Sequence, residues 1–144
     1  MDALIHSRLL NTRFEKISVE RGPGAGLPPG GKLGIEISAS MAESKGAANQ
    51  TVARIELDVL GIPTAAKTED DFGFKVHITC AGHYEWPTLE KRPALNKNVV
   101  EVLCLPIYAV AAAEATRLVR SLEMGTLKLP ADLRVAKDEE IVIN

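Results

Sequence analysis

The chain has 144 residues, of which 46% are hydrophobic and 4% aromatic, so it can form one domain with an aliphatic core. Its 17 basic and 19 acidic residues give a net charge of −2, and this balance gives no electrostatic reason to expect nucleic acid or an acidic membrane as a partner. Residues 1–20 carry no targeting pattern, and a proline and three charged residues interrupt the longest apolar stretch, residues 99–119; we therefore expect a single cytoplasmic domain, residues 1–144, without a membrane span.

The first predicted strand covers residues 8–20. Its apolar positions change parity once, with Leu10, Thr12 and Phe14 on one face before Ile17 and Val19 on the other. A one-residue slip of this kind predicts a β-bulge. Residues 21–31 then hold five Gly and three Pro. A phosphate cradle would need a helix after it, whereas a strand pattern follows, so we predict a loop that crosses or covers another element.

Three further strands are predicted at residues 32–42, 51–60 and 72–84. In each, apolar residues alternate with polar ones, as expected of strands that bury one face. Three such strands in succession indicate an antiparallel meander that is covered on one side only.

The helical part is predicted at residues 97–124. Residues 97–104 favour a short helix over a buried extended turn, and Pro106 suits the first turn of a long helix that ends before Gly125. An apolar stripe follows this helix, made of Tyr108, Ala111, Ala112, Ala115, Leu118, Val119 and Leu122. The fold class is α+β: a four-stranded antiparallel sheet in residues 8–84, a short and a long helix on one face, and a tail at 125–144.

Three residues of the last predicted strand, His77, Cys80 and His83, suggest a metal site. Side chains alternate along a strand, so Cys80 would point away from the face that carries both histidines. The histidines would also lie about 20 Å apart at ~3.3 Å per residue. We therefore predict neither a metal nor another cofactor.

Catalytic side chains are equally hard to find. Cys104 has apolar neighbours on both sides, which raises a thiol pKa instead of activating the group, and Cys80 and Cys104 are predicted to be free core residues. The carboxylates of Glu36, Glu56 and Asp58 fall on the polar faces of strands, where they are normally solvated. The sequence predicts a protein that is not an enzyme.

An apolar cluster lies between the last strand and the long helix, and it has two interpretations. It is either core folded over the sheet or a groove for an extended peptide. Its members are Tyr84, Trp86, Leu89, Leu95, Val99, Val100 and Leu103.

Four pieces of the sequence form a series. They are FEKISVERGPG at residues 14–24, the meander that follows, CAGHYEW at 80–86 and LCLPIYAVAAAEATRLVRSLEMGTLKLPADL at 103–133. In order and spacing they resemble the SecB-type protein-export chaperones and their toxin–antitoxin relatives. That family carries Ile-Ser near the end of its first strand, and its Leu/Phe-Pro-Tyr helix runs into Leu-x-Leu-Pro. The motifs are short, and the resemblance covers residues 8–135.

The resemblance implies dimers that pair into homotetramers through the sheets and the long helix. It also implies a chaperone without cofactor that binds unfolded or extended polypeptides in apolar grooves, here the seven-residue cluster, for export or for a dedicated partner such as an antitoxin. Small side chains suit close helix packing, so the oligomer interface is predicted at Tyr108, Ala111, Ala112, Ala115, Leu118 and Val119.

The sequence departs from the export members at positions that dock the translocation motor. Only Glu20 matches an acidic position there, and it is the candidate motor contact. Lys16 and His77 stand where export members carry acidic residues, and the tail is shorter. A dedicated chaperone fits these departures better than general export. Two alternatives remain open: an adaptor subunit that binds one folded partner, and a small-ligand or enzymatic domain with a pocket under the long helix.

Overall fold

The alternating segments of the sequence form long strands in the computed structural model, which describes residues 8–27, 30–43, 49–87, 96–122, 129–130 and 138–143. In chain order the elements, with η for a 3-10 helix, are β1 (Arg8–Arg21), η1 (Pro23–Gly26), β2 (Gly31–Glu43), β3 (Gln50–Pro63), η2 (Glu69–Asp71), β4 (Phe74–Glu85), α2 (Lys97–Ser121) and β5 (Asp138–Ile143). The strand order is β1-β4-β3-β2-β5. The predicted four-stranded antiparallel sheet is confirmed, and β5 adds a fifth, parallel strand from the segment predicted as a tail.

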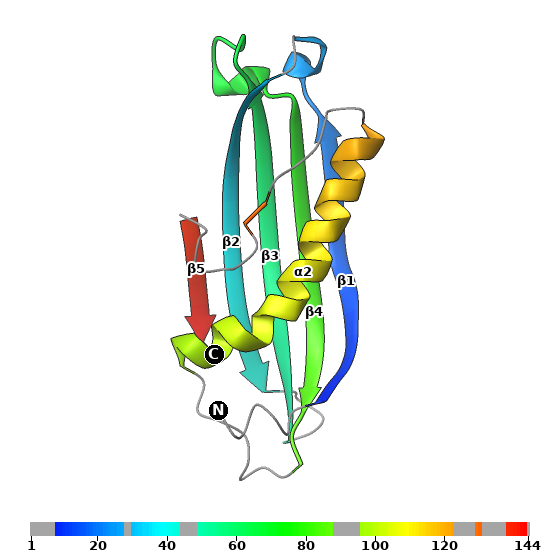
Figure 1. The fold of residues 1–144 in the computed structure, drawn as a ribbon, viewed down its shortest axis with the longest axis vertical. Coiled ribbons are helices and arrows are strands. Elements are labelled where there is room, and N and C mark those ends of the chain that lie inside the picture. Colours follow the sequence, from blue (N-terminus) through cyan, green and yellow to red (C-terminus); the bar gives the residue numbers. More distant parts are fainter. Residues whose placement is uncertain are drawn as a thin grey trace.

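The Gly/Pro-rich segment after β1 carries the chain past one end of the sheet, because β1 pairs with β4 and not with β2 (Figure 1). The amide of Gly24 donates a hydrogen bond to the carbonyl of Phe72 at 2.9 Å. A Cβ on Gly24 would lie 1.9 Å from the carbonyl oxygen of Asp71. Glycine is needed here because two backbone segments approach each other closely.

The β-bulge predicted in the first strand is confirmed. The register of β1 on β4 shifts between Phe14 and Lys16, so the parity of the apolar positions changes there. As a result Phe14, Ile17 and Val19 all have register partners on the face of β4 that is buried. Those partners are Cys80, Ile78 and Val76.

The helical part is one 25-residue helix, α2, and not a short helix followed by a long one. Asn96 caps it, since its side-chain oxygen accepts a hydrogen bond from the amide of Val99 at 3.1 Å. Pro106 lies inside the helix, where a proline removes one backbone hydrogen bond. Burial on both sides of Pro106 explains why the helix continues through this residue: Val100 and Leu103 before it are buried against the sheet, as is Ile107 after it.

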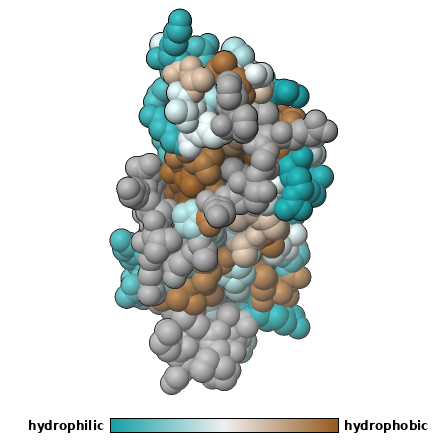
Figure 2. All heavy atoms as spheres, turned by 45° about the horizontal axis from the view of Figure 1, so that its top comes forward, coloured by the Kyte–Doolittle hydropathy of each residue, from teal (hydrophilic) through white to brown (hydrophobic). Residues whose placement is uncertain are grey.

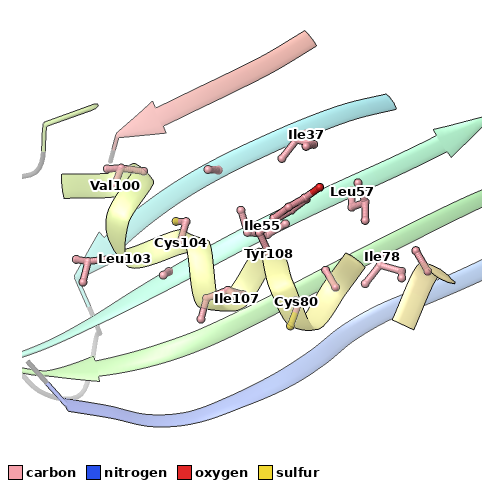
Figure 3. Packing of buried hydrophobic residues seen from close by; sticks show 14 of the residues in the cluster. Ile37, Ile55, Leu57, Ile78, Cys80, Val100, Leu103, Cys104, Ile107 and Tyr108 are labelled. Atoms are coloured by element: carbon pink, nitrogen blue, oxygen red, sulfur yellow. The ribbon is translucent and has the colours of Figure 1, made fainter. Parts of the chain in front are cut away.

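The core lies between α2 and one face of the sheet (Figure 3). α2 crosses that face diagonally and packs mainly on β3 and β4. The fully buried side chains come from both layers and include Ile37, Ile55, Leu57, Ile78, Val100 and Ile107. Ala111 and Ala115 are also fully buried, and their small side chains let the helix backbone lie close to the strands.

Within the described residues, α2 is also the one helix that is long and apolar enough to cross a membrane, judged by length and composition alone. The sequence-based expectation of no such segment is therefore too strong. In the most apolar window of α2, 44% of the residues are buried inside the chain. Packing on the sheet thus explains the apolar residues on the inner side of α2. The other apolar residues lie on its outward side.

Candidate binding surface

The residues predicted to form a peptide groove lie mostly in the core. Trp86 is 0% exposed and Tyr84 5%, and their rings stack with centroids 6.5 Å apart. The indole Nε1 donates a hydrogen bond to Thr51 Oγ1 at 2.8 Å, which satisfies a polar group that would be costly to bury alone. Val100 and Leu103 are buried as well. The core interpretation of the cluster therefore describes these four residues in this conformation.

The other three groove candidates, Val99, Leu89 and Leu95, do not decide between a groove and a core. Val99 is only partly buried and packs against the core. Leu89 and Leu95 lie outside the described residues. One hollow of about 530 Å³ lies on the polar face of the sheet and another of about 470 Å³ lies beside Lys32 and Pro63. Neither is lined by a groove candidate.

The Tyr84 hydroxyl and the Cys104 thiol are buried groups that stay protonated at neutral pH. The Tyr84 hydroxyl donates to the carbonyl oxygen of Leu103 at 2.7 Å, and burial raises the pKa of Tyr84 to about 12. Burial likewise raises the pKa of the Cys104 thiol to about 12, and Cys80 and Cys104 are both free. A thiol that stays protonated is a poor nucleophile.

The residues of the predicted oligomer interface lie mostly on the sheet-facing side of α2. Tyr108, Ala111, Ala115 and Val119 are at most 2% exposed because they form the sheet-facing side of α2. The Tyr108 hydroxyl donates to the carbonyl oxygen of Pro130 at 2.6 Å. In this conformation these four residues contact the chain's own core and offer no surface to a second chain. Ala112 and Leu118, the other two candidates, are partly buried against the same core.

The outward side of α2 is also apolar, which the sequence analysis missed. Val102 and Val110 are 37% and 38% exposed. They belong to a row of exposed residues at spacings of three and four, which we call the outer helix row: Val102, Pro106, Ala109, Val110 and Ala113. Figure 2 shows hydrophobic patches on this helix-bearing side of the molecule. A helix that is apolar on both sides is expected to cover a second surface as well as its own sheet.

A second exposed apolar region follows β1, at the edge of the sheet. We call it the β1 patch, and its residues are Leu9, Phe14, Ile17 and Val19, which are 37–43% exposed. Their register partners on β4 are buried beneath α2 or beside it, so the patch lies on the helix-bearing face. Outside β1 no further strand follows in the part of the chain that the structure describes. A long apolar edge strand is prone to pair with another chain.

A third, smaller region lies at the start of β2, where α2 leaves the sheet uncovered. Leu33 is 39% exposed and Ile35 is partly buried, and we call them the β2 patch. Ile35 is the register partner of Val59, which is in the core, so both patch residues share the helix-bearing face. The β1 patch and the β2 patch therefore lie at the two margins of the surface that α2 crosses (Figure 1).

The other face of the sheet is polar and carries charges of both signs. Nδ1 of His77 lies 2.6 Å from Asp58 Oδ1, and the Arg54 guanidinium bonds Glu15 at 2.5 Å. That hydrogen bond is the main reason that the pKa of Glu15 is lowered. Glu20, the predicted motor contact, is the register partner of Lys75. A cation at the neighbouring position reduces the local negative charge that motor docking would require.

The three residues considered as a metal site, His77, Cys80 and His83, do not lie on one face of the sheet. Cys80 is buried on the helix-bearing face, whereas His77 bonds Asp58 on the polar face and His83 Nδ1 lies 3.0 Å from Asn11 Oδ1. Within the described residues no group of three His, Cys, Asp or Glu side chains could hold a metal ion. Glu36, Asp58 and His77 line a hollow of about 530 Å³ on the polar face, and His77 and Asp58 are the pair in contact there.

Comparison with known proteins supports the fold. No protein-family model matches the sequence, and no curated protein matches it. The Mycobacterium tuberculosis SecB-like chaperone Rv1957, solved in complex with a ChAD peptide from the HigA1 antitoxin, superposes with a TM-score of 0.65 over 90% of each chain, at 10% identity. A protein of unknown function from Streptococcus agalactiae superposes with a TM-score of 0.50 over 86% of this chain and 96% of its own, at 12% identity. The SecB-like fold predicted from the motifs is confirmed.

Proposed function

Since the fold is SecB-like, we propose that the chain is a chaperone that binds extended apolar segments of unfolded polypeptides without ATP, in the cytoplasm, and holds them for a dedicated partner such as an antitoxin. The observation that carries the proposal is the exposed apolar surface at the margins of α2. The superposed SecB-like chaperone binds an antitoxin peptide, which supports a polypeptide as the ligand class.

The geometry suits an extended chain better than a compact ligand. A strand edge offers backbone N–H and C=O groups at regular spacing, and apolar side chains next to it accept alternate residues of the added segment. Leu33 and Ile35 lie on β2, ahead of the register with β5, which begins at Glu36 among the residues that the structure describes. Burial of apolar area favours the complex and is offset by the entropy lost on association, and neither effect requires bond hydrolysis.

We assign self-association to the other margin. The β1 patch and the outer helix row are exposed, and both lie on the helix-bearing side. A second copy that pairs along β1 would cover the edge of the sheet, and helices with small outward side chains such as Ala109 and Ala113 could then pack closely. In this arrangement two dimers pair into a tetramer, and the β1 patch and the outer helix row are both covered by other chains.

The test is a titration of the purified full chain against a fluorescently labelled, permanently unfolded protein, without nucleotide. We expect binding that Leu33→Glu weakens about tenfold or more, because a charge in the β2 patch must be desolvated. Leu60→Glu is the matched control, since it makes the same substitution on the polar face of the sheet, beside its register partner Lys75, and it should bind normally.

Two results would reject the proposal. One is no binding of unfolded chains by the native oligomer. The other is tight binding of one folded protein together with indifference to unfolded ones, which would identify an adaptor subunit.

A further inference from the structure

β5 has an unusual position for a segment near the end of the chain. Its six residues pair in parallel with β2, from Glu36 beside Asp138 to Met41 beside Ile143. All other strand pairs in the described residues are antiparallel. Figure 1 shows β5 at the edge of the sheet, with the early turns of α2 near its end. The strand therefore closes an edge of β2 that would otherwise be open.

The sequence of β5 combines three acidic residues with three β-branched residues, DEEIVI. β-Branched residues favour strands. However, β5 is short, parallel and paired on one side only within the described part of the chain. Parallel pairs are slightly weaker per residue than antiparallel ones, and elements with few partners open at low free energy. β5 is the strand of this sheet expected to detach most readily.

The apolar side chains of β2 are more exposed ahead of the β5 register than within it. Leu33, ahead of the β5 register, is 39% exposed, whereas Ile37, Ala39 and Met41 within the register are at most 1% exposed. α2 also contacts β2, with Cys104 Sγ 3.8 Å from the carbonyl oxygen of Ser40. Without β5, a row of backbone hydrogen-bonding groups beside three apolar side chains would face solvent, which is the arrangement to which extended peptides add a strand.

We propose that residues 138–143 occupy, within the same chain, a strand-addition site on the edge of β2 at residues 36–41, and that an incoming polypeptide must displace them. The displaced segment indicates the ligand: an extended stretch, parallel to β2, with acidic residues followed by consecutive β-branched residues. This inference rests on the proposed function, because it names the segment that the chaperone selects and the contact that restrains binding.

The expected size of the effect follows from tethering. A segment joined to its own binding site acts at an effective concentration of order mM. A site that is free in only one molecule in ten reduces the apparent affinity of a competitor tenfold. A chain in which β5 is locked should therefore bind peptide poorly, and a chain in which β5 is released should bind it well.

A disulfide lock tests this directly in the full chain. Ser38 and Glu140 are register partners, and neighbouring strands lie ~4.8 Å apart, within the Cα separation that a disulfide spans. The double variant Ser38→Cys/Glu140→Cys is oxidised or kept reduced, and a labelled peptide with the sequence of residues 136–144 is titrated into each form. The native Cys80 and Cys104 are buried and should not compete.

We expect the oxidised form to bind the peptide at least tenfold more weakly than the reduced form, and reductant to restore binding. The single variant Ser38→Cys is the control and should not respond to oxidation. Equal affinities of the locked and reduced forms would overturn the proposal. A disulfide that joins two chains instead of one would overturn it as well, because β5 would then belong to the edge of a neighbouring copy.

A released variant gives an independent measurement. Ile141→Pro/Val142→Pro removes consecutive backbone donors, so at least one of them is a donor that faces β2. This variant should bind the peptide at least tenfold more tightly than the native chain. Ile141→Val/Val142→Ile retains strand propensity and should behave as the native chain does. Unchanged affinity in the proline variant would contradict displacement.

The unfolded protein serves as a second probe and separates this inference from the proposed function. If locked and reduced forms bind the unfolded protein equally well, the strand-addition site is wrong and the chaperone proposal stands. If neither form binds the unfolded protein but peptide binding still follows the lock, the site is correct and the chaperone proposal is wrong.

Discussion

The two sides of α2 are both apolar, yet they have different environments. The inner side, with Val100, Ile107 and Ala111, is fully buried against the sheet. On the outer side, Val102 and Val110 remain more than a third exposed. The inner side stabilises one chain. The outer side contributes nothing to that chain's core, so its apolar character points to contact with another polypeptide. The predictions below test this division, beginning with the largest expected effect.

Trp86→Ala should produce the largest loss, because Trp86 belongs to the same interior as the inner side of α2. The change removes a fully buried indole and leaves the Thr51 hydroxyl without the partner it has now. We expect a loss of about 3–5 kcal/mol in the free energy of unfolding, measured by urea denaturation. Val102→Ala on the outer side is the control and should cost less than about 0.5 kcal/mol. Similar losses for both variants would erase the distinction between the two sides.

Val110→Asp should weaken self-association and leave the stability of the single chain nearly unchanged. A carboxylate on the outer helix row leaves the core untouched but must be desolvated if a second chain covers it. We expect self-association to weaken at least tenfold, about 1.4 kcal/mol, in sedimentation experiments, with little change in the unfolding of the dissociated chain. Asn98→Asp, which adds the same group at an exposed position in the first turn of α2, should associate normally. Retention of the native oligomer by Val110→Asp would exclude the outer helix row as an interface.

The strands could be predicted from the sequence because alternation and the parity change in β1 are local signals. The two sides of α2 could not be assigned, because Ala111 and Ala109 have the same side chain and only the sheet decides which is buried. The same limit applies to Trp86, whose side chain suits a pocket or a core equally well until Thr51 is found beside it. β5 was missed because parallel pairing joins segments far apart in sequence, and DEEIVI alone does not identify β2 as its partner.

Burial of Tyr84 should make the stability of the fold depend on pH in alkaline solution. Its pKa is raised to about 12 by burial, whereas an unfolded tyrosine ionises near pH ~10. The folded state therefore retains the proton longer, and the resulting stability is complete below pH ~10 and is lost as the pH rises toward 12. Cys104 contributes in the same direction, beginning at lower pH.

Tyr84→Phe should cost about 1 kcal/mol near neutral pH, because the hydrogen bond to Leu103 is lost. Between pH 10 and 12 the native chain should lose its advantage, since phenylalanine cannot ionise. Urea midpoints of both proteins over this range provide the measurement. A constant difference between them would mean that Tyr84 ionises in the folded chain as it does in solution.

The smallest effect is expected on the polar face. Arg54 lowers the pKa of Glu15 below its ordinary value of 4.5, so the pair stabilises the fold above the unfolded pKa and its contribution disappears as the pH falls through the folded one. Glu15→Gln should cost about 0.2–1 kcal/mol at pH 7 and nothing at strongly acidic pH. A cost that stays the same at both pH values would point to packing, not charge.

The central claim is that a client polypeptide binds the β2 patch at one margin of the helix-bearing face while the interior stays closed. Amide hydrogen exchange of the native oligomer, with and without an unfolded client, tests it most directly. We predict slower exchange in residues 31–36 when client is bound, and unchanged exchange in α2 around Ile107 and in the segment around Trp86. Client protection that is confined to the segment around Trp86, with residues 31–36 unaffected, would contradict the account.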